Sequence, residues 1–263
     1  MIEVSSDWWK TLFDEIYLQT DARSIDNEKL TRIEIDLICQ LIPLQPHHFI
    51  LDLCGGQGRH SIELYRRGFE RCTVFDYSKA LLKIGAELAR RGNYRIEFVQ
   101  GDARDTQLRS ELFDCVLILG NSLGYIPEAD ADLRIIHESH RLLKPGGWLL
   151  LDVTDGAIVR NKFTPNAWHE IGTDMVVCRQ RQLEGATISV REMVMSKQSG
   201  LIRDESYCVR LYEAAELIDL VTRAGFVEGC RHTEFDPLLT EADLGFMNHR
   251  MLVSARKRNV QKK

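Results

Sequence analysis

The sequence lacks any apolar run long enough to cross a bilayer, because nowhere do about 18 uninterrupted apolar residues occur. Residues 1–10 also lack an apolar stretch followed by a cleavage site, so no export signal is expected. Both absences argue against a membrane or exported protein. We therefore expect a cytoplasmic protein with no membrane partner.

The cysteines lack the spacing of a structural site. Seven of them, an odd number, are scattered along 263 residues without a CxxC pair or a mixed Cys and His ligand pattern. This distribution argues against both a disulfide framework and a zinc site, and we expect no bound metal.

Positive charge is also scarce. Thirty-four Lys and Arg stand against 39 Asp and Glu, which gives a formal net charge of -5 and a pI near 5.9. Without a basic stripe the chain has no general field that attracts phosphate backbones, so nucleic acid is a poor partner. A small-molecule substrate suits this charge better, whereas the choice between a monomer and a homodimer stays open.

Short apolar runs alternate with helix-like stretches through the middle of the chain. The runs cover residues 49–53, 72–76, 96–99, 115–119 and 148–152. Strands that are apolar on both sides and alternate with helices are typical of a parallel sheet covered on both faces. The pattern predicts an α/β fold with a doubly wound, mostly parallel sheet of the Rossmann type.

The flanking regions have other patterns. Helical spacing predicts two helices in the first forty residues, the first of them containing Trp8, Leu12 and Ile16. Alternating apolar and polar residues between about 155 and 210 predict a small antiparallel β insert after strand 5. We therefore expect a helical cap at 1–46, a binding core at 47–154, a lid at 155–211 and the completion of the core sheet at 212–263.

Three acidic or glycine-rich segments follow the predicted strands. The loop with Gly56 and Gly58 lies between a strand and a helix, where glycines let the backbone approach a ligand, although such a loop alone is weak evidence. Asp76 ends the second strand about twenty residues later, where a carboxylate accepts hydrogen bonds from ribose hydroxyls. Asp102 follows the third strand and could accept a hydrogen bond from an adenine amino group.

Four motifs together resemble those of class I S-adenosylmethionine-dependent methyltransferases. They are LDLCGGQGRH at 51–60, VFD at 74–76, GDAR at 101–104 and LLKPGG at 142–147. The resemblance covers nearly the whole chain and looks nearest to a bacterial group acting on small molecules, mostly of unassigned substrate. That group shares the patterns AWHE at 167–170 and VRLY at 209–212.

The resemblance implies a seven-stranded sheet with an antiparallel last strand, and S-adenosylmethionine as cofactor with S-adenosylhomocysteine as product. It implies that Asp52 and the glycine loop surround the methionine part, with Asp76 on ribose and Asp102 on adenine. Cys54 departs from the family pattern, which has glycine there. The full set of expected cofactor residues is Tyr17, Asp52, Gly56, Gly58, His60, Asp76, Tyr77, Asp102, Ala103, Leu119 and Asn121.

The expected reaction moves a methyl group to a nitrogen or oxygen atom of a small molecule. The candidate substrate residues are Tyr125, Trp168, His169 and Arg210, and His169 is the candidate base or orienting group. Three alternatives stay open. They are a regulatory protein that binds S-adenosylmethionine without turnover, a nicotinamide-dependent oxidoreductase and an RNA methyltransferase.

Overall fold

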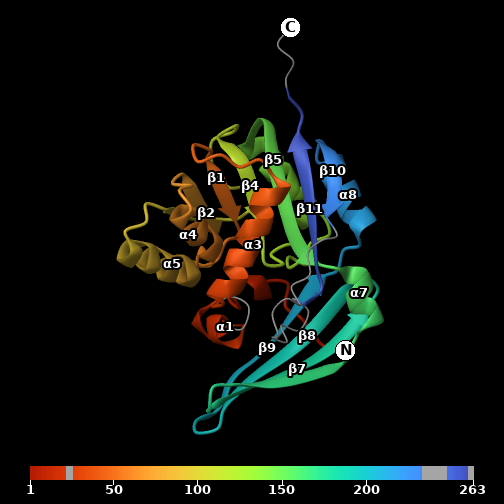
Figure 1. Ribbon diagram of the computed structural model, residues 1–263. Helices are drawn as coiled ribbons and strands as arrows, with labels where there is room; N and C mark the ends of the chain where they lie inside the picture. The colour runs from red at the N-terminus through yellow and green to blue at the C-terminus, as the bar shows by residue number, and fades with distance from the viewer. Residues whose placement is uncertain (22–25, 233–247, 260–263) are drawn as a thin grey trace.

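The computed structural model describes residues 1–21, 26–232 and 248–259. Figure 1 shows a central sheet with helices on both faces and a second, smaller sheet that projects from the end where the parallel strands finish. No helix of these described ranges is long and apolar enough to cross a membrane.

The central sheet has seven strands in the order β10-β11-β5-β4-β1-β2-β3. The pairs β3–β2, β2–β1, β1–β4 and β4–β5 are parallel, whereas β11 runs antiparallel to both of its neighbours, β5 and β10. This confirms the predicted fold class, including the antiparallel last strand. The strands are β1 (Ile50–Leu53), β2 (Cys72–Asp76), β3 (Glu97–Gln100), β4 (Phe113–Ile118), β5 (Leu143–Thr154), β10 (Phe226–His232) and β11 (Arg250–Lys257).

Both faces of the central strands are buried, as their apolar sequences predict. In β4, Val116 and Ile118 belong to one apolar cluster, whereas Cys115 and Leu117 belong to the cluster on the other face. Helices α6 (Ala131–Leu142) and α8 (Ala214–Arg223) cover the first face. Helices α3 (Glu28–Leu41) and α4 (Arg59–Arg66) cover the second, and α5 (Lys79–Gly92) packs on β2 and β3.

The N-terminal region differs from the expectation of two helices. The first predicted helix is divided into a short 3-10 helix, η1 (Trp8–Lys10), and α1 (Glu15–Thr20). Asp14 lies between them in an extended conformation, and its carboxylate accepts hydrogen bonds from the N–H groups of Ile16 and Tyr17 at 2.9 and 3.1 Å. An N-cap of this kind begins a new helix, so the apolar spacing continues across a break.

The predicted insert is a four-stranded antiparallel meander after β5 and the short helix α7 (Gly156–Asn161). Its strands are β6 (Asn166–Ile171), β7 (Met175–Glu184), β8 (Thr187–Ser196) and β9 (Gly200–Arg210). Gly185 and Gly200 have φ values of 58° and 82° at the turns, which suits glycine.

Leu142 of the LLKPGG segment ends α6, and the rest of the segment, residues 143–147, lies within β5. β5 begins at Leu143, and its pairing with β4 shifts register between the partners of Phe113 and Cys115. Gly146 has φ 80° within this irregular stretch. The segment is therefore an interruption inside the strand, which glycine makes sterically accessible.

Candidate functional site

A cavity of about 450 Å³ lies at the carboxyl ends of the parallel strands. Its walls come from the loops after β1, β2, β3 and β4, from η1 and α1, and from the inner side of the β6–β9 sheet. Ligands of doubly wound sheets bind at this edge, and the volume is in the usual range for small-molecule pockets. Core, N-terminal region and insert thus share one site.

The glycine loop after β1 has two glycines with different surroundings. Gly56 has φ 56°, and a Cβ added there would meet Leu81 at 3.5 Å, so its backbone is open to the cavity. Gly58 caps α4, and its added Cβ would lie 2.9 Å from Val74 Cγ2. Gly58 therefore allows close packing under the loop and does not line the cavity. Cys54 adopts φ 60°, so it keeps the backbone conformation that glycine favours.

Asp76 lies where β2 ends and faces the cavity. Its Oδ2 accepts a hydrogen bond from the Gly56 N–H and its Oδ1 accepts one from the Ser78 N–H, both at 2.8 Å. Burial raises the pKa of Asp76 to about 6, although these backbone donors oppose the shift. The carboxylate thus holds the glycine loop and the start of α5 together.

Asp102 and Ala103 line the same cavity after β3. The Arg104 guanidinium donates two hydrogen bonds to Asp102, with Nη2 2.7 Å from Oδ2 and Nε 3.0 Å from Oδ1. Burial alone would raise the pKa of Asp102, but the hydrogen bonds and charge of Arg104 outweigh burial and hold the pKa below its ordinary value. Asp102 is therefore a fixed carboxylate.

Asp52 lies beneath the glycine loop and is not part of the cavity lining. Its Oδ2 accepts a hydrogen bond of 3.0 Å from Ser61 Oγ, whereas no donor in the described part of the chain reaches its buried Oδ1. A Cβ on Gly55 would lie 2.6 Å from Asp52 Cγ, so the loop folds directly over this carboxylate. Burial raises the pKa of Asp52.

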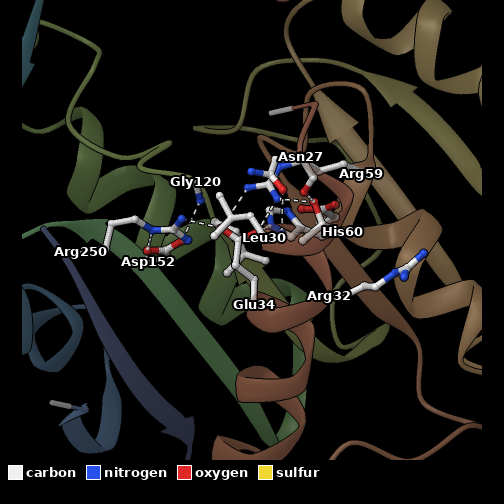
Figure 2. A network of polar contacts seen from close by, with 12 residues as sticks. Asn27, Leu30, Arg32, Glu34, Arg59, His60, Gly120, Asp152 and Arg250 are labelled. Atoms are coloured by element: carbon white, nitrogen blue, oxygen red, sulfur yellow. Dashed lines mark hydrogen bonds and ion pairs between the residues drawn. The ribbon is translucent and has the colours of Figure 1, made fainter. Parts of the chain in front are cut away.

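His60 lines the cavity as part of a buried ionic network that sequence reasoning missed. Figure 2 shows Glu34 of α3 between Arg59 and His60 of α4 on one side and Arg250 of β11 on the other. Burial alone would raise the pKa of Glu34, but the charges of Arg59 and Arg250 hold it well below its ordinary value. Arg250 also contacts Asp152.

Aromatic side chains from the N-terminal region close one wall. Trp9 and Tyr77 pack edge to face with ring centroids 4.7 Å apart, and Phe13 contacts Tyr17 at 5.0 Å. All four line the cavity. The Ser78 hydroxyl donates to the Phe13 carbonyl at 2.6 Å, which fixes this wall to the start of α5.

The loop after β4 contributes Leu119, Asn121 and Tyr125. Asn121 Oδ1 accepts a hydrogen bond of 2.8 Å from the Thr154 N–H, while its Nδ2 donates to the Tyr125 hydroxyl at 3.2 Å. Asn121 has φ 62°, a conformation that asparagine tolerates better than most residues. It therefore links the end of β5 to an aromatic side chain in the cavity.

The insert residues expected at the substrate lie in different places. His169 and its neighbour Trp168 on the edge strand β6 both line the cavity, although Trp168 is 71% exposed. Arg210 lies outside the lining, because its guanidinium pairs with Asp132 of α6 and donates to the Glu128 carbonyl. Arg210 anchors the insert to the core.

Twelve of the expected residues therefore meet around one cavity. They are Tyr17, Gly56, His60, Asp76, Tyr77, Asp102, Ala103, Leu119, Asn121, Tyr125, Trp168 and His169. The other three, Asp52, Gly58 and Arg210, support the walls from behind. No group of three or more His, Cys, Asp or Glu side chains in the described ranges has the arrangement of a metal site.

Sequence reasoning also missed a charged group on the insert side of the cavity. Arg179 of β7 donates from Nε to Glu192 Oε2 at 2.7 Å, and its Nη2 lies 3.2 Å from Asp21 Oδ2. All three side chains line the cavity. A signal was present, because Glu192 interrupts the apolar register of Ile188, Val190 and Val194 in β8.

The donor and acceptor set suits a nucleoside with a charged tail. The carboxylates of Asp76 and Asp102, at the ends of β2 and β3, lie in one cavity with the open backbone of Gly56 and several aromatic side chains. S-Adenosylmethionine needs acceptors for ribose and adenine and close backbone approach for its amino-acid part, so these residues fit it.

The comparison with protein families gives a direct match. Residues 50–147 match a family model described as "Methyltransferase domain". This stretch begins at β1 and ends within β5, so it contains the glycine loop and both strand-end carboxylates.

Curated relatives agree with this match. The chain is 28% identical over 181 residues to "Putative methyltransferase YqeM" of Bacillus subtilis, covering 67% of this chain and 72% of that protein. It is 35% identical over 104 residues to a glycine/sarcosine N-methyltransferase of Aphanothece halophytica, covering 39% of each. It is 30% identical over 115 residues to a ubiquinone/menaquinone biosynthesis C-methyltransferase of Sinorhizobium fredii, covering 41% of this chain and 42% of that one. The chain thus spans less than half the length of the latter two relatives.

Solved structures share the whole fold. The CcbJ methyltransferase of Streptomyces caelestis superposes with a TM-score of 0.74 at 21% identity, covering 95% of this chain and 99% of that one. CalS10, an amino pentose methyltransferase of Micromonospora echinaspora bound to S-adenosylmethionine, gives 0.66 at 17% identity, covering 94% and 98%. At these identities the likeness concerns the fold. Taken with the matched domain, it shows that residues 50–147 form a methyltransferase domain and that the chain has the fold of S-adenosylmethionine-dependent methyltransferases.

Proposed function

We propose that this methyltransferase transfers its methyl group to a nitrogen or oxygen atom of a small molecule. The observation that carries the proposal is a cavity of about 450 Å³ that extends from the strand-end carboxylates to the inner face of the insert. The N-terminal region and the insert both wall this cavity, so a macromolecular acceptor would reach it with difficulty. The net charge of -5 also disfavours nucleic acid.

The cofactor lies along the ends of β1 to β4 in this proposal. Asp76 accepts hydrogen bonds from the ribose hydroxyls, and Asp102 accepts one from the adenine amino group. Gly56 and His60 face the methionine part, with Asp52 and Gly58 supporting the loop from beneath. The remaining contacts come from Tyr17, Tyr77, Ala103, Leu119 and Asn121.

The four segments of the chain then have distinct roles. Residues 1–46 cap the cofactor, 47–154 bind it, 155–211 cover the acceptor and 212–263 complete the central sheet. Ion pairs hold the cover to the cap, since Arg203 of β9 contacts Asp14 at 2.5 Å and Arg179 contacts Asp21. Such a covered site excludes water and holds the acceptor in line with the methyl group.

The acceptor occupies the insert side of the cavity. The bound cofactor supplies an electrophilic methyl group on a sulfonium, and the chain positions the attacking atom. Tyr125 and His169 contact the acceptor, and His169 orients it or accepts its proton. Trp168 borders the opening, and Arg210 keeps the insert against α6.

A polar acceptor atom suits this wall better than a carbon atom. His169, Glu192 and Tyr207 bring ionisable or hydroxyl groups to the insert side. Among the related proteins, one is a glycine/sarcosine N-methyltransferase and one an amino pentose methyltransferase, although another is a C-methyltransferase. Nitrogen or oxygen acceptors therefore have the stronger support.

Calorimetric titration with S-adenosylmethionine, S-adenosylhomocysteine and NAD tests the cofactor half of the proposal. We expect both sulfur nucleosides to bind and NAD to leave no heat of binding. Transfer of a radiolabelled methyl group to paired small amines, phenols and alcohols then tests the acceptor half. Labelling of carbon acids alone would contradict it.

A further inference from the structure

Glu192 is an unusual residue for its place in the insert sheet. It shares the inward face of β8 with Ile188, Val190 and Val194, all of which are fully buried. Glu192 itself is 3% exposed and lines the cavity. Since a charged side chain at an apolar register position costs free energy unless it is paired, this carboxylate needs a partner or a function.

Its pairing is incomplete. Arg179 donates from Nε to Glu192 Oε2 at 2.7 Å, and the same guanidinium is shared with Asp21 through Nη2. Within the described ranges no donor reaches Glu192 Oε1, although the side chain is more than nine-tenths buried. One guanidinium therefore pairs with two carboxylates, and Oε1 of the cavity-lining Glu192 side chain has no donor among the described residues.

Two tyrosines connect the Arg179 and Glu192 pair to the loop after β4, where the cofactor is proposed to bind. Tyr125 and Tyr207 line the cavity beside the Arg179 group, and Tyr125 receives the hydrogen bond of Asn121 from the end of β4. Burial raises the pKa of Glu192, and the charge of Arg179 opposes that shift. The other charged or titratable side chains on this side of the cavity include Asp21, Lys162, His169, Arg181 and His249, and the charge of Arg203 also acts on Glu192.

We propose that Glu192, which lines the cavity, binds the acceptor nitrogen through Oε1 and that the acceptor of this enzyme is therefore an amine. This inference rests on the proposed methyl transfer and narrows its acceptor class. His169 then keeps the role of an orienting group.

The electron and proton balance is simple. The amine nitrogen donates its lone pair to the methyl carbon as the carbon–sulfur bond breaks, and the sulfur keeps the bonding pair. The new ammonium loses one N–H proton to Glu192 Oε1, and the resulting carboxylic acid passes it to water. A carboxylate suits an amine in this step, because it can hold an N–H throughout but is a weak base toward an alcohol.

Sinefungin provides a probe that does not require the acceptor to be known. In this analogue a carbon bearing an ammonium group replaces the sulfonium and its methyl, so a charged nitrogen projects from the cofactor toward the acceptor. S-Adenosylhomocysteine lacks this group and otherwise matches it. The ratio of their dissociation constants therefore measures how strongly the protein interacts with a charged nitrogen at the position of the transferred methyl group.

The test measures both dissociation constants for the wild type and for Glu192→Gln, which retains an oxygen for Arg179. We expect sinefungin to bind about tenfold more weakly to the variant while S-adenosylhomocysteine stays within about twofold. Asp204→Asn is the matched control, since Asp204 pairs with Arg191 on the exposed side of the insert. It should leave both constants unchanged.

An unchanged ratio in Glu192→Gln overturns the inference, whether both ligands bind normally or both weaken together. A wild type that binds neither ligand overturns the proposed function as well, so the two failures are distinct. If Glu192→Gln does not fold, Glu192→Asp takes its place, because it keeps the charge and shortens the reach. Glu192→Asp must weaken the binding of sinefungin more than that of S-adenosylhomocysteine; otherwise the inference fails.

Discussion

Asp76 Oδ2 accepts a hydrogen bond of 2.8 Å from the backbone N–H of Gly56. The carboxylate proposed for the ribose therefore also fixes the loop proposed for the methionine part of the cofactor. Its other oxygen holds the Ser78 N–H at the start of α5. Protonation of this one side chain would disturb both halves of the cofactor site.

Cofactor affinity should fall in mild acid because burial raises the pKa of Asp76 to about 6. In the proposed site the ribose hydroxyls donate to the ionised carboxylate, and at pH 5 about one tenth of the ligand-free protein would carry that carboxylate ionised. We expect the dissociation constant of S-adenosylhomocysteine to rise about tenfold between pH 7.5 and pH 5. Calorimetry across this range measures it. Asp76→Asn should bind weakly at every pH, and a variant with the wild-type pH profile would refute the assignment.

The same pKa shift predicts a change in stability with pH. The folded-state pKa of Asp76 is raised from 3.8 to about 6, so between these values the folded protein binds more protons than the unfolded one. The contribution of Asp76 to the free energy of unfolding therefore falls as pH rises through this window, by up to about 3 kcal/mol. Urea denaturation of wild type and Asp76→Asn should show the variant gaining relative stability from pH 4 to pH 7. A constant difference would contradict the shift.

Truncation of the Arg250 side chain should lower the free energy of unfolding more than truncation of most other side chains. It pairs with Glu34 and Asp152 where all three are buried, and Asp152 also accepts the Gly120 N–H at 2.9 Å. Arg250→Met leaves two carboxylates without their shared cation, which should lower the free energy of unfolding by about 3–5 kcal/mol. Arg223→Met is the control, because Arg223 and its partner Asp219 are both largely exposed. Similar losses in the two variants would show that the buried network contributes little.

The fold was predictable because its signals are local. Apolar runs that alternate with helical stretches define a covered parallel sheet, and parallel strands bring their carboxyl ends to one edge. Asp76 and Asp102 are therefore placed near each other by position in the chain alone. The glycine-rich turn and the antiparallel insert likewise depend on short-range patterns.

The features that the sequence did not predict have a common cause. A local pattern of polar and apolar residues does not identify partners that are distant in the chain. The spacing of Trp8 and Ile16 fits one helix, yet the Asp14 side chain caps a new one. Glu34 reads as one polar residue of an amphipathic helix, although its partner Arg250 lies 216 residues away. Arg210 matched a family pattern but pairs with Asp132, which no local sequence signal indicates.

Arg203 should control how long the cofactor stays bound. Its guanidinium lies 2.5 Å from Asp14 Oδ1 and donates to the Leu12 carbonyl at 3.3 Å, so β9 holds the segment that leads into α1. Arg203→Met would release this segment, which carries Tyr17, while Asp14 still caps α1. We expect S-adenosylhomocysteine to dissociate about tenfold faster, since affinity changes act mostly through dissociation. Stopped-flow displacement measures the rate.

The matched control for Arg203 is Arg191→Met, which removes an arginine of the same sheet from an exposed pair with Asp204. Its dissociation rate should equal that of the wild type. Because the glycine loop, Asp76 and Asp102 lie on the central sheet, the association step should change little in either variant. Equal dissociation rates in Arg203→Met and Arg191→Met would mean that the N-terminal segment stays closed without its ion pair, and that the aromatic contacts of Trp9 and Phe13 hold it in place.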